Sequence, residues 1–255
     1  MRWIKEYGIN GALYMGQGGM EGGDAAADIL LGDVNPSGRL VDTFAGTLED
    51  YPSTEGFHES FDYVNYNEDI YVGYRYFLTI PEAEKKIVYP FGYGKSYTSF
   101  ESNIVAMSLC DDTFYFTVKV TNTGSIPGKN VVQLYYSAPQ GKLGKPAREL
   151  GAFAKTRVLG PNESQVITLS VSKYQISSYD DLGKVKEACY VLEKGEYKFF
   201  LGNDSLDVAA TNLVWNNEED EVVATLSHKL APVELEKECL QMVAMRNYHR
   251  GSIRI

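Results

Sequence analysis

From about residue 101 onward, apolar and polar side chains alternate along short stretches, and each such stretch predicts a β-strand. In FYFTVKV the apolar side chains of Phe114, Phe116, Val118 and Val120 share one face. QVITLSVS repeats this pattern and places Ile167, Leu169 and Val171 inward. VVQLYYSA predicts another strand, and YVLEKGEYKFFLG predicts two strands around Lys194-Gly195. Short strands separated by turns over roughly 110 residues predict an all-β sandwich at residues 101–212.

The pattern before this region is that of an α/β protein. INGALYMG is a short apolar run that ends in glycine and predicts a buried strand. AAADILL places Ala26, Ile29 and Leu30 on one face, which predicts a helix capped by Asp24 and closed by a left-handed Gly32. One helix beside one or two strands is too little to fold alone. We therefore expect residues 1–40 to belong to the final portion of a larger α/β domain.

A segment rich in tyrosine and carboxylate follows this helix. Eight acidic residues and no Lys or Arg lie between Arg39 and Arg75, and nine of the 19 tyrosines fall between Tyr51 and Tyr97. We predict a long ordered loop over 51–68, and IYVGYRYF predicts either a strand or a short helical turn. Tyrosine with carboxylate suits a carbohydrate-facing surface. The alternative is a loop held on a neighbouring surface by its aromatic side chains.

The last residues, 213–255, are predicted to be a tail or linker that is partly helical. The tail is acidic after Trp215, and further on four apolar side chains form a helical stripe that needs a partner surface. These residues are Leu235, Cys239, Met242 and Val243.

Composition narrows the function classes. Apolar residues make up 44% and charged residues 23% of the chain, as in ordinary globular proteins. The chain contains no run of about 18 apolar residues, and its start lacks the pattern of a secretory signal, so we expect no membrane partner. Three scattered cysteines argue against a disulfide framework or a zinc site and favour a cytoplasmic location. A net charge of −10 makes nucleic acid an unfavourable partner.

The sequence does not match the common motifs for nucleotide binding or nucleophilic catalysis. A dinucleotide fingerprint that starts at Gly16 would have Glu21 at its third glycine position. The GKS at 94–96 has Tyr89 where a phosphate-binding loop needs glycine. There is no G-x-S-x-G elbow, and of three histidines only His58 lies in a segment that could face a cleft.

Paired carboxylates are the remaining candidate chemistry, because retaining glycosidases use two carboxyl groups about 5–5.5 Å apart. The acidic segment supplies such groups, but the sequence does not indicate which of them converge. They are Glu55, Glu59, Asp62, Glu68 and Asp69.

Four stretches in register resemble glycoside hydrolase family 3, the family of β-glucosidases and β-xylosidases. They are GMEGGDAAADILLGDVNPSGRL, YNEDIYVGYRYF, YPFGYGKSYTSF and the strands from GKNVVQLYYSAP to YVLEKGEYKFFLGNDS. Lys95 replaces a leucine that is usual in the third stretch. The resemblance extends the expected α/β portion to residues 1–100, which it implies are the last third of the family's α/β sandwich domain, followed by a fibronectin III-like domain. In this interpretation the glycines around Gly22 serve packing and bind no phosphate.

The resemblance also implies a function for the intact enzyme. Family members hydrolyse terminal β-linked sugars with retention of configuration, without cofactor or metal, using an aspartate nucleophile from a (β/α)8 barrel and an acid/base glutamate from an upstream loop. Neither group maps onto this sequence, so we predict no catalytic residue here and no activity of this chain by itself. The barrel would be supplied in cis or in trans, and a β-linked oligosaccharide or glucoside would be the substrate.

The part of this sequence that the resemblance places nearest to the substrate is the tyrosine-rich segment. His58, Glu59, Tyr63 and Tyr66 are the candidate substrate-binding rim. The alternative function is a stand-alone fibronectin III-like module that binds carbohydrate or protein without turnover.

Overall fold

The computed structural model of the chain describes residues 3–54, 56–57, 60–64, 66, 68–209, 213–227, 229 and 253–254. The apolar stripe predicted for the tail, Leu235 to Val243, lies outside the described residues. No helix among the described residues is both long enough and apolar enough to span a bilayer.

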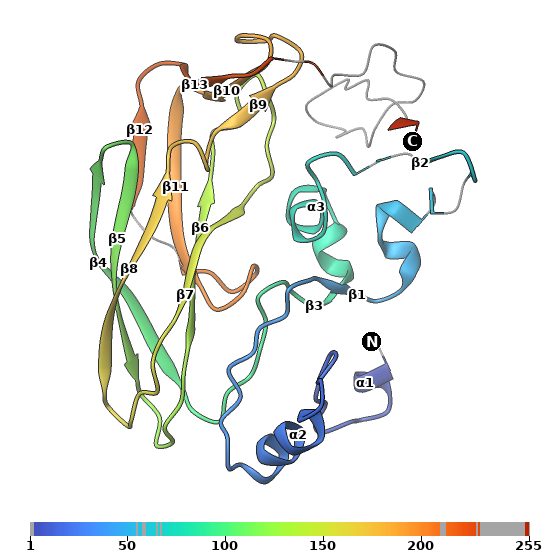
Figure 1. Cartoon of the computed structure of the whole chain (residues 1–255), viewed down its shortest axis with the longest axis vertical. Coiled ribbons are helices and arrows are strands. Elements are labelled where there is room, and N and C mark those ends of the chain that lie inside the picture. Colours follow the sequence, from blue (N-terminus) through green and yellow to red (C-terminus); the bar gives the residue numbers. More distant parts are fainter. Residues whose placement is uncertain are drawn as a thin grey trace.

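Most of the described chain forms an antiparallel β-sandwich (Figure 1). One sheet has the order β4-β5-β8, with β4 at Phe100–Cys110, β5 at Thr113–Asn122 and β8 at Ser164–Ser172. The facing sheet has the order β12-β11-β6-β7, with strands at Val214–Asn217, Gly195–Gly202, Val131–Ser137 and Glu149–Lys155. A smaller sheet has the order β13-β10-β9, with strands at Glu221–Thr225, Cys189–Leu192 and Ser178–Asp180.

The sandwich core forms as the alternating pattern predicts. Phe114, Phe116, Val118 and Val120 of β5 all have 0% exposure. Leu169 and Val171 of β8 are buried in the same cluster, and Ile167 packs at its margin. The Phe116 ring lies 4.8 Å from that of Phe199 on β11, so aromatic contacts join the two sheets across the core.

The two strands around Lys194-Gly195 are present, but they do not form a hairpin. β10 pairs with β9 and β13, whereas β11 pairs with β6 and β12. The chain therefore crosses from one sheet to the next at this point. Gly195 has φ +134, a backbone conformation that side-chain-bearing residues rarely adopt.

The sandwich extends past residue 212, where the predicted boundary lies. β12 and β13 add strands to two of its sheets. The Trp215 ring on β12 packs 5.1 Å from Phe114 and 5.2 Å from Tyr197, so it completes the core edge. Packing of this half-buried ring against the core favours the pairing of β12 with β11 despite the acidic side chains that follow.

The first hundred residues form short elements beside the sandwich (Figure 1). The helices are α1 (Trp3–Glu6), α2 (Gly22–Leu31) and α3 (Tyr74–Thr79), with 3-10 turns η1 (Leu48–Asp50), η2 (Pro52–Thr54) and η3 (Ala83–Lys86). The short strands β1 (Phe44–Ala45) and β3 (Ile87–Tyr89) pair with each other, and β2 (Tyr63–Val64) pairs with β14 (Ile253–Arg254).

The predicted α2 helix exists and ends as expected, with Gly32 at φ 86 in the left-handed region. Asp24 is not its cap. Glu21 occupies that position, and Asp24 lies in the first turn, where a carboxylate faces the positive end of the helix dipole. Leu30 and Leu31 are 72% and 78% exposed.

The strand predicted over residues 9–16 does not form. A strand requires a neighbour for its backbone N–H and C=O groups, and no described strand pairs with this stretch. IYVGYRYF, for which strand and helical turn were both open, contains the helix α3.

Asp180, at the end of β9, organises the loop after it and is fully buried. Its carboxylate accepts backbone N–H bonds from Lys184 at 3.1 Å, Val185 at 2.6 Å and Lys186 at 3.0 Å. Burial acts to raise the pKa of Asp180, but these N–H donors outweigh it and hold the pKa below its usual value.

We expect Asp180→Asn to lower the free energy of unfolding by about 1–3 kcal/mol at pH 7, because charge-assisted bonds to buried N–H groups are lost. Since the folded-state pKa is depressed, this stabilisation is present above pH ~4 and is lost as the pH falls through the folded pKa. Urea unfolding of both proteins at pH 7 and pH 3 should show a difference that shrinks in acid. A difference that is equal at both pH values would contradict the assignment.

Candidate functional site: the tyrosine-rich segment and its docking on the sandwich

Tyr51 pins the start of the tyrosine-rich segment, which we define as residues 51–73. Its hydroxyl donates to Thr43 O at 2.7 Å and accepts from Ala45 N at 2.8 Å. Its ring meets Phe77 of α3 edge to face, with centroids 5.6 Å apart. This tyrosine therefore acts as a structural clamp, as the second interpretation of the sequence predicts.

Tyrosines at the other end are also structural. Tyr71 is 3% exposed. Tyr74 stacks on Phe91 with centroids 4.5 Å apart, and its hydroxyl accepts a bond from Leu150 N at 2.9 Å. Burial raises the pKa of Tyr74. Both ends of the segment are thus anchored by aromatic side chains.

Between these anchors, Glu68 is the carboxyl group with the most distinctive environment. Partial burial raises the pKa of Glu68, the nearby Asp42 charge raises it further, and a hydrogen bond with Ser53 opposes the rise. Gly73, further along the segment, has φ 58 and ψ −128, a conformation suited to glycine. A carboxyl group so placed can exchange hydrogen bonds with the hydroxyls of a sugar.

The structure describes the other predicted acids of the segment only in part. Glu55 and Glu59 lie outside the described residues, Asp62 is exposed, and Asp69 has a left-handed φ of 52. In the part of the chain that the structure describes, no group of three His, Cys, Asp or Glu residues is arranged to hold a metal ion.

The predicted rim residues are only partly visible. His58 and Glu59 lie outside the described residues, and Tyr63 begins the short strand β2. Tyr66 is 61% exposed. Two further aromatic side chains in the segment, Phe57 and Phe61, are 74% and 108% exposed, and the sequence interpretation did not select them. The signal that could have found them is the run of aromatic residues in GFHESFDYVNY.

The NPSG turn and the arginine that follows it build an interface with the sandwich. Asn35 Oδ1 accepts from Ser96 Oγ and Tyr97 N, both at 2.9 Å, and Asn35 Nδ2 donates to Pro127 O at 3.0 Å. The Arg39 guanidinium donates to Gly94 O and to Asn130 Oδ1, the latter at 2.9 Å. Both side chains thereby connect the first hundred residues to the sandwich.

Gln133 of β6 makes the reciprocal connection from the sandwich. Its Nε2 donates to Gly92 O at 3.1 Å and to Asn203 O at 2.7 Å, and its Oε1 accepts from Tyr135 OH at 2.7 Å. Gly92 has φ +83, and a Cβ there would lie 2.1 Å from Gln133 Oε1. Only glycine fits at this approach. Gln133 and Tyr135 are buried beneath this contact.

The helix α3 docks on the start of β7. The bonds are Ala147 N to Thr79 Oγ1 at 2.9 Å, the ion pair of Arg75 Nε with Glu149 Oε2 at 2.8 Å, and Leu150 N to Tyr74 OH at 2.9 Å. The motifs singled out in the sequence therefore form the interface between the two domains. The tyrosine-rich segment is connected to this interface through α3, which directly follows it.

Two family profiles match the chain. The glycosyl hydrolase family 3 C-terminal domain matches residues 1–97, and a fibronectin type III-like domain matches residues 130–205.

Relatives agree with both profiles. The chain is 55% identical over 254 residues to beta-glucosidase A of Butyrivibrio fibrisolvens, covering 93% of this chain and 31% of the relative. It is 45% identical over 234 residues to a beta-glucosidase of Ruminococcus albus, covering 91% of this chain and 24% of the relative. The chain thus spans about a third or less of these relatives.

A solved structure gives the same result. The beta-glucosidase from Paenibacillus barengoltzii superimposes with a TM-score of 0.76 at 47% identity, covering 85% of this chain and 23% of that one. With the interdomain joint in place and both profiles matched in order, the chain belongs to glycoside hydrolase family 3, of which it carries the C-terminal α/β domain segment and the fibronectin III-like domain.

Proposed function

We propose that this chain is one part of a β-glucosidase that hydrolyses terminal β-linked sugars with retention of configuration. The observation that carries the proposal is its 55% identity to beta-glucosidase A across 93% of its own length. The nucleophilic aspartate comes from a barrel domain and the acid/base glutamate from an upstream loop, joined in cis or supplied in trans. The aspartate attacks the anomeric carbon while the glutamate protonates the departing oxygen of the broken glycosidic bond. Water, deprotonated by the same glutamate, then hydrolyses the covalent glycosyl–enzyme and releases the sugar and the aspartate.

The contribution of this chain is to hold and shape one wall of the site. Anchoring by Tyr51 and Tyr74 at the two ends of the tyrosine-rich segment supports this role. Glu68 and Asp42 carry no assigned catalytic function, and we expect the 255-residue chain alone to be inactive on an aryl β-glucoside.

The test is a chimera in which this chain replaces the matching third of the Butyrivibrio enzyme. We expect kcat/KM on an aryl β-glucoside within about tenfold of the parent, a change of about 1.4 kcal/mol in activation free energy. The parent lacking that third is the control and should be inactive. A folded but inactive chimera contradicts the proposal. So does hydrolysis by this chain alone that Glu68→Gln abolishes, and sugar binding without turnover would favour a stand-alone binding module.

The rim assignment has its own test within the chimera. We place His58, Glu59, Tyr63 and Tyr66 beside the substrate, and the exposure of Tyr66 supports this placement. Tyr66→Ala should raise KM about 3- to 10-fold, the equivalent of losing a ring contact of about 0.5–1.5 kcal/mol, with kcat nearly unchanged. Tyr115→Ala, on the sheet that faces away from this segment in Figure 1, is the matched control. Equal KM values in both variants would remove Tyr66 from the rim.

A further inference from the structure

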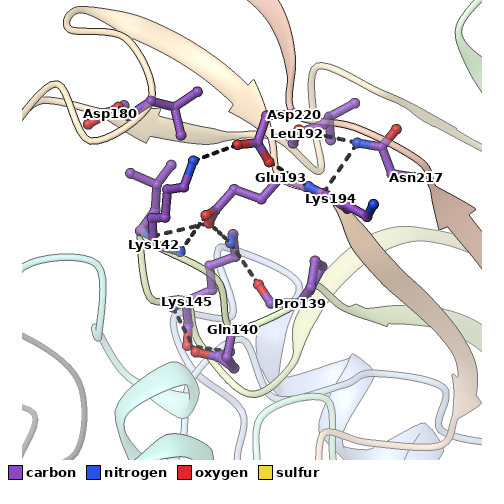
Figure 2. A network of polar contacts seen from close by, with 12 residues as sticks. Pro139, Gln140, Lys142, Lys145, Asp180, Leu192, Glu193, Lys194, Asn217 and Asp220 are labelled. Carbon is purple, nitrogen blue, oxygen red and sulfur yellow. Dashed lines mark hydrogen bonds and ion pairs between the residues drawn. The ribbon is translucent and has the colours of Figure 1, made fainter.

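A buried charge lies at the end of β10, outside the segment just described. The side chain of Glu193 is 3% exposed, and so is that of its partner Lys145 (Figure 2). The Glu193 carboxylate accepts bonds from Lys145 Nζ, from Lys142 N, and from Leu143 N at 3.1 Å. The connection between β6 and β7 is therefore wrapped around one carboxylate.

Further bonds close this connection on itself. Lys145 Nζ also donates to Pro139 O at 2.7 Å. The Gln140 side chain accepts from Lys145 N at 3.1 Å and donates to Lys145 O at 2.9 Å. We call Pro139, Gln140, Lys142, Lys145 and Glu193 the Glu193 clamp. Its bonds pair several backbone N–H and C=O groups of this loop that burial would otherwise leave without partners.

The residues that directly follow the Glu193 clamp in the sequence are the ones that contact α3. Only Pro146 separates Lys145 from Ala147, whose N–H bonds to Thr79, and Glu149 and Leu150 follow within five residues of Lys145. Any change in the path of this loop at Lys145 moves the three donors and acceptors on which α3 rests.

The helix α3 is only six residues long. Isolated helices shorter than about 12–15 residues are marginal in water, so α3 depends on its tertiary contacts. It also follows the tyrosine-rich segment directly, and Phe77 at its centre packs against Tyr51 at the other end of that segment. The position of α3 therefore sets the position of the segment.

We propose that the Lys145–Glu193 pair is a positioning device through which the fibronectin III-like domain places α3 and, with it, the substrate-facing segment. The role toward substrate rests on the proposed function; the mechanical coupling does not. A buried ion pair is a poor source of stability, since two apolar side chains of similar volume often stabilise a core as well or better. Apolar side chains cannot accept the N–H bonds of Lys142 and Leu143, so only the carboxylate holds the loop in this shape.

The experiment is hydrogen exchange on the 255-residue chain, which requires no catalysis. The variants are Glu193→Leu, Lys145→Met, and the two combined. The matched control is the exposed pair Arg157–Glu163, changed to Met and Leu. We expect the combined variant to recover most of the melting temperature that the single variants lose, while amides of 140–150 and of α3 exchange at least about tenfold faster than in the unmodified chain. Amides of β5 and of the control variant should be unchanged.

If the pair only stabilised the domain, the combined variant would regain the hydrogen-exchange protection of α3 along with its melting temperature. Recovery of α3 protection together with the melting temperature in the combined variant would overturn the proposal, as would fast exchange confined to 140–145. If the combined variant does not fold, Glu149→Gln decides, because it removes the charge that pairs with Arg75 of α3, lies outside α3 itself and leaves the clamp intact. We expect faster exchange in α3 with residues 140–145 unchanged; an unchanged α3 in that variant would also overturn the proposal.

Discussion

Replacing Lys145 by methionine is expected to lower the free energy of unfolding by about 3–5 kcal/mol. The side chains have similar length, so the packing is largely kept, and the effect reports the loss of the ammonium group with its bonds to Glu193 and to Pro139 O. Glu193 would then be buried at 3% side-chain exposure without its cation, and two backbone N–H bonds compensate only part of the cost of burying the carboxylate. Typical free energies of unfolding are about 5–15 kcal/mol, so the Lys145 ammonium group accounts for a large fraction of the stability of the folded state.

Urea unfolding at 25 °C followed by tryptophan fluorescence measures this loss, because the half-buried Trp215 packs against the sandwich core. The matched control is Lys142→Met, three residues earlier, whose exposed Nζ contacts Asp220 at 2.9 Å. Exposed ion pairs contribute little, so the control midpoint should be nearly unchanged. Equal midpoints for both variants would mean that the burial of the Glu193 clamp carries no energetic weight.

Truncation of Phe116 to alanine is the second large effect, with an expected loss of about 3–5 kcal/mol. Phe116 has 0% exposure and contacts Phe199 of the opposite sheet with ring centroids 4.8 Å apart, so alanine leaves a cavity that both sheets would have to close. Thermal and urea unfolding should agree on the loss.

The control for Phe116 is its neighbour on the strand. Tyr115→Ala removes a ring of comparable size from the outer face, where Tyr115 is 40% exposed, and should cost less than about 1 kcal/mol. Because the two residues share the same strand and differ in face, equal losses would contradict the orientation of β5.

The fibronectin III-like domain has two roles. Its aromatic core supplies stability, and its β6–β7 connection presents a rigid surface to α3. The sheet strand β6 serves both, since Leu134 lies in the core while Gln133 and Tyr135 on its other face are buried under Gly92 and its neighbours.

The local sequence pattern was enough to predict the elements whose conformation depends on residues close in the sequence. The alternation in β5 follows from a side-chain period of two, so Phe114 to Val120 could be assigned to the core from the sequence. Gly32 could be assigned to a helix end because left-handed backbone favours glycine. The family motifs could be matched for the same reason, since they are continuous stretches of residues.

Contacts between distant residues could not be obtained this way. The sequence predicts two strands beside Gly195 but not that they join different sheets, because that choice depends on β6, β9 and β13. It also predicts no strand at Trp215. The position of that strand depends on the contacts of the Trp215 ring with Phe114 and Tyr197, which are distant in the sequence.

By itself the sequence determined the family and the sandwich with its alternating core. Only the tertiary structure decided that Asn35, Arg39 and Gln133 form the joint between domains, and that Lys145 and Glu193, 48 residues apart, meet in a buried pair. The physical reason is that the desolvation of a charge or amide depends on everything packed around it, and those neighbours are brought together only by the fold.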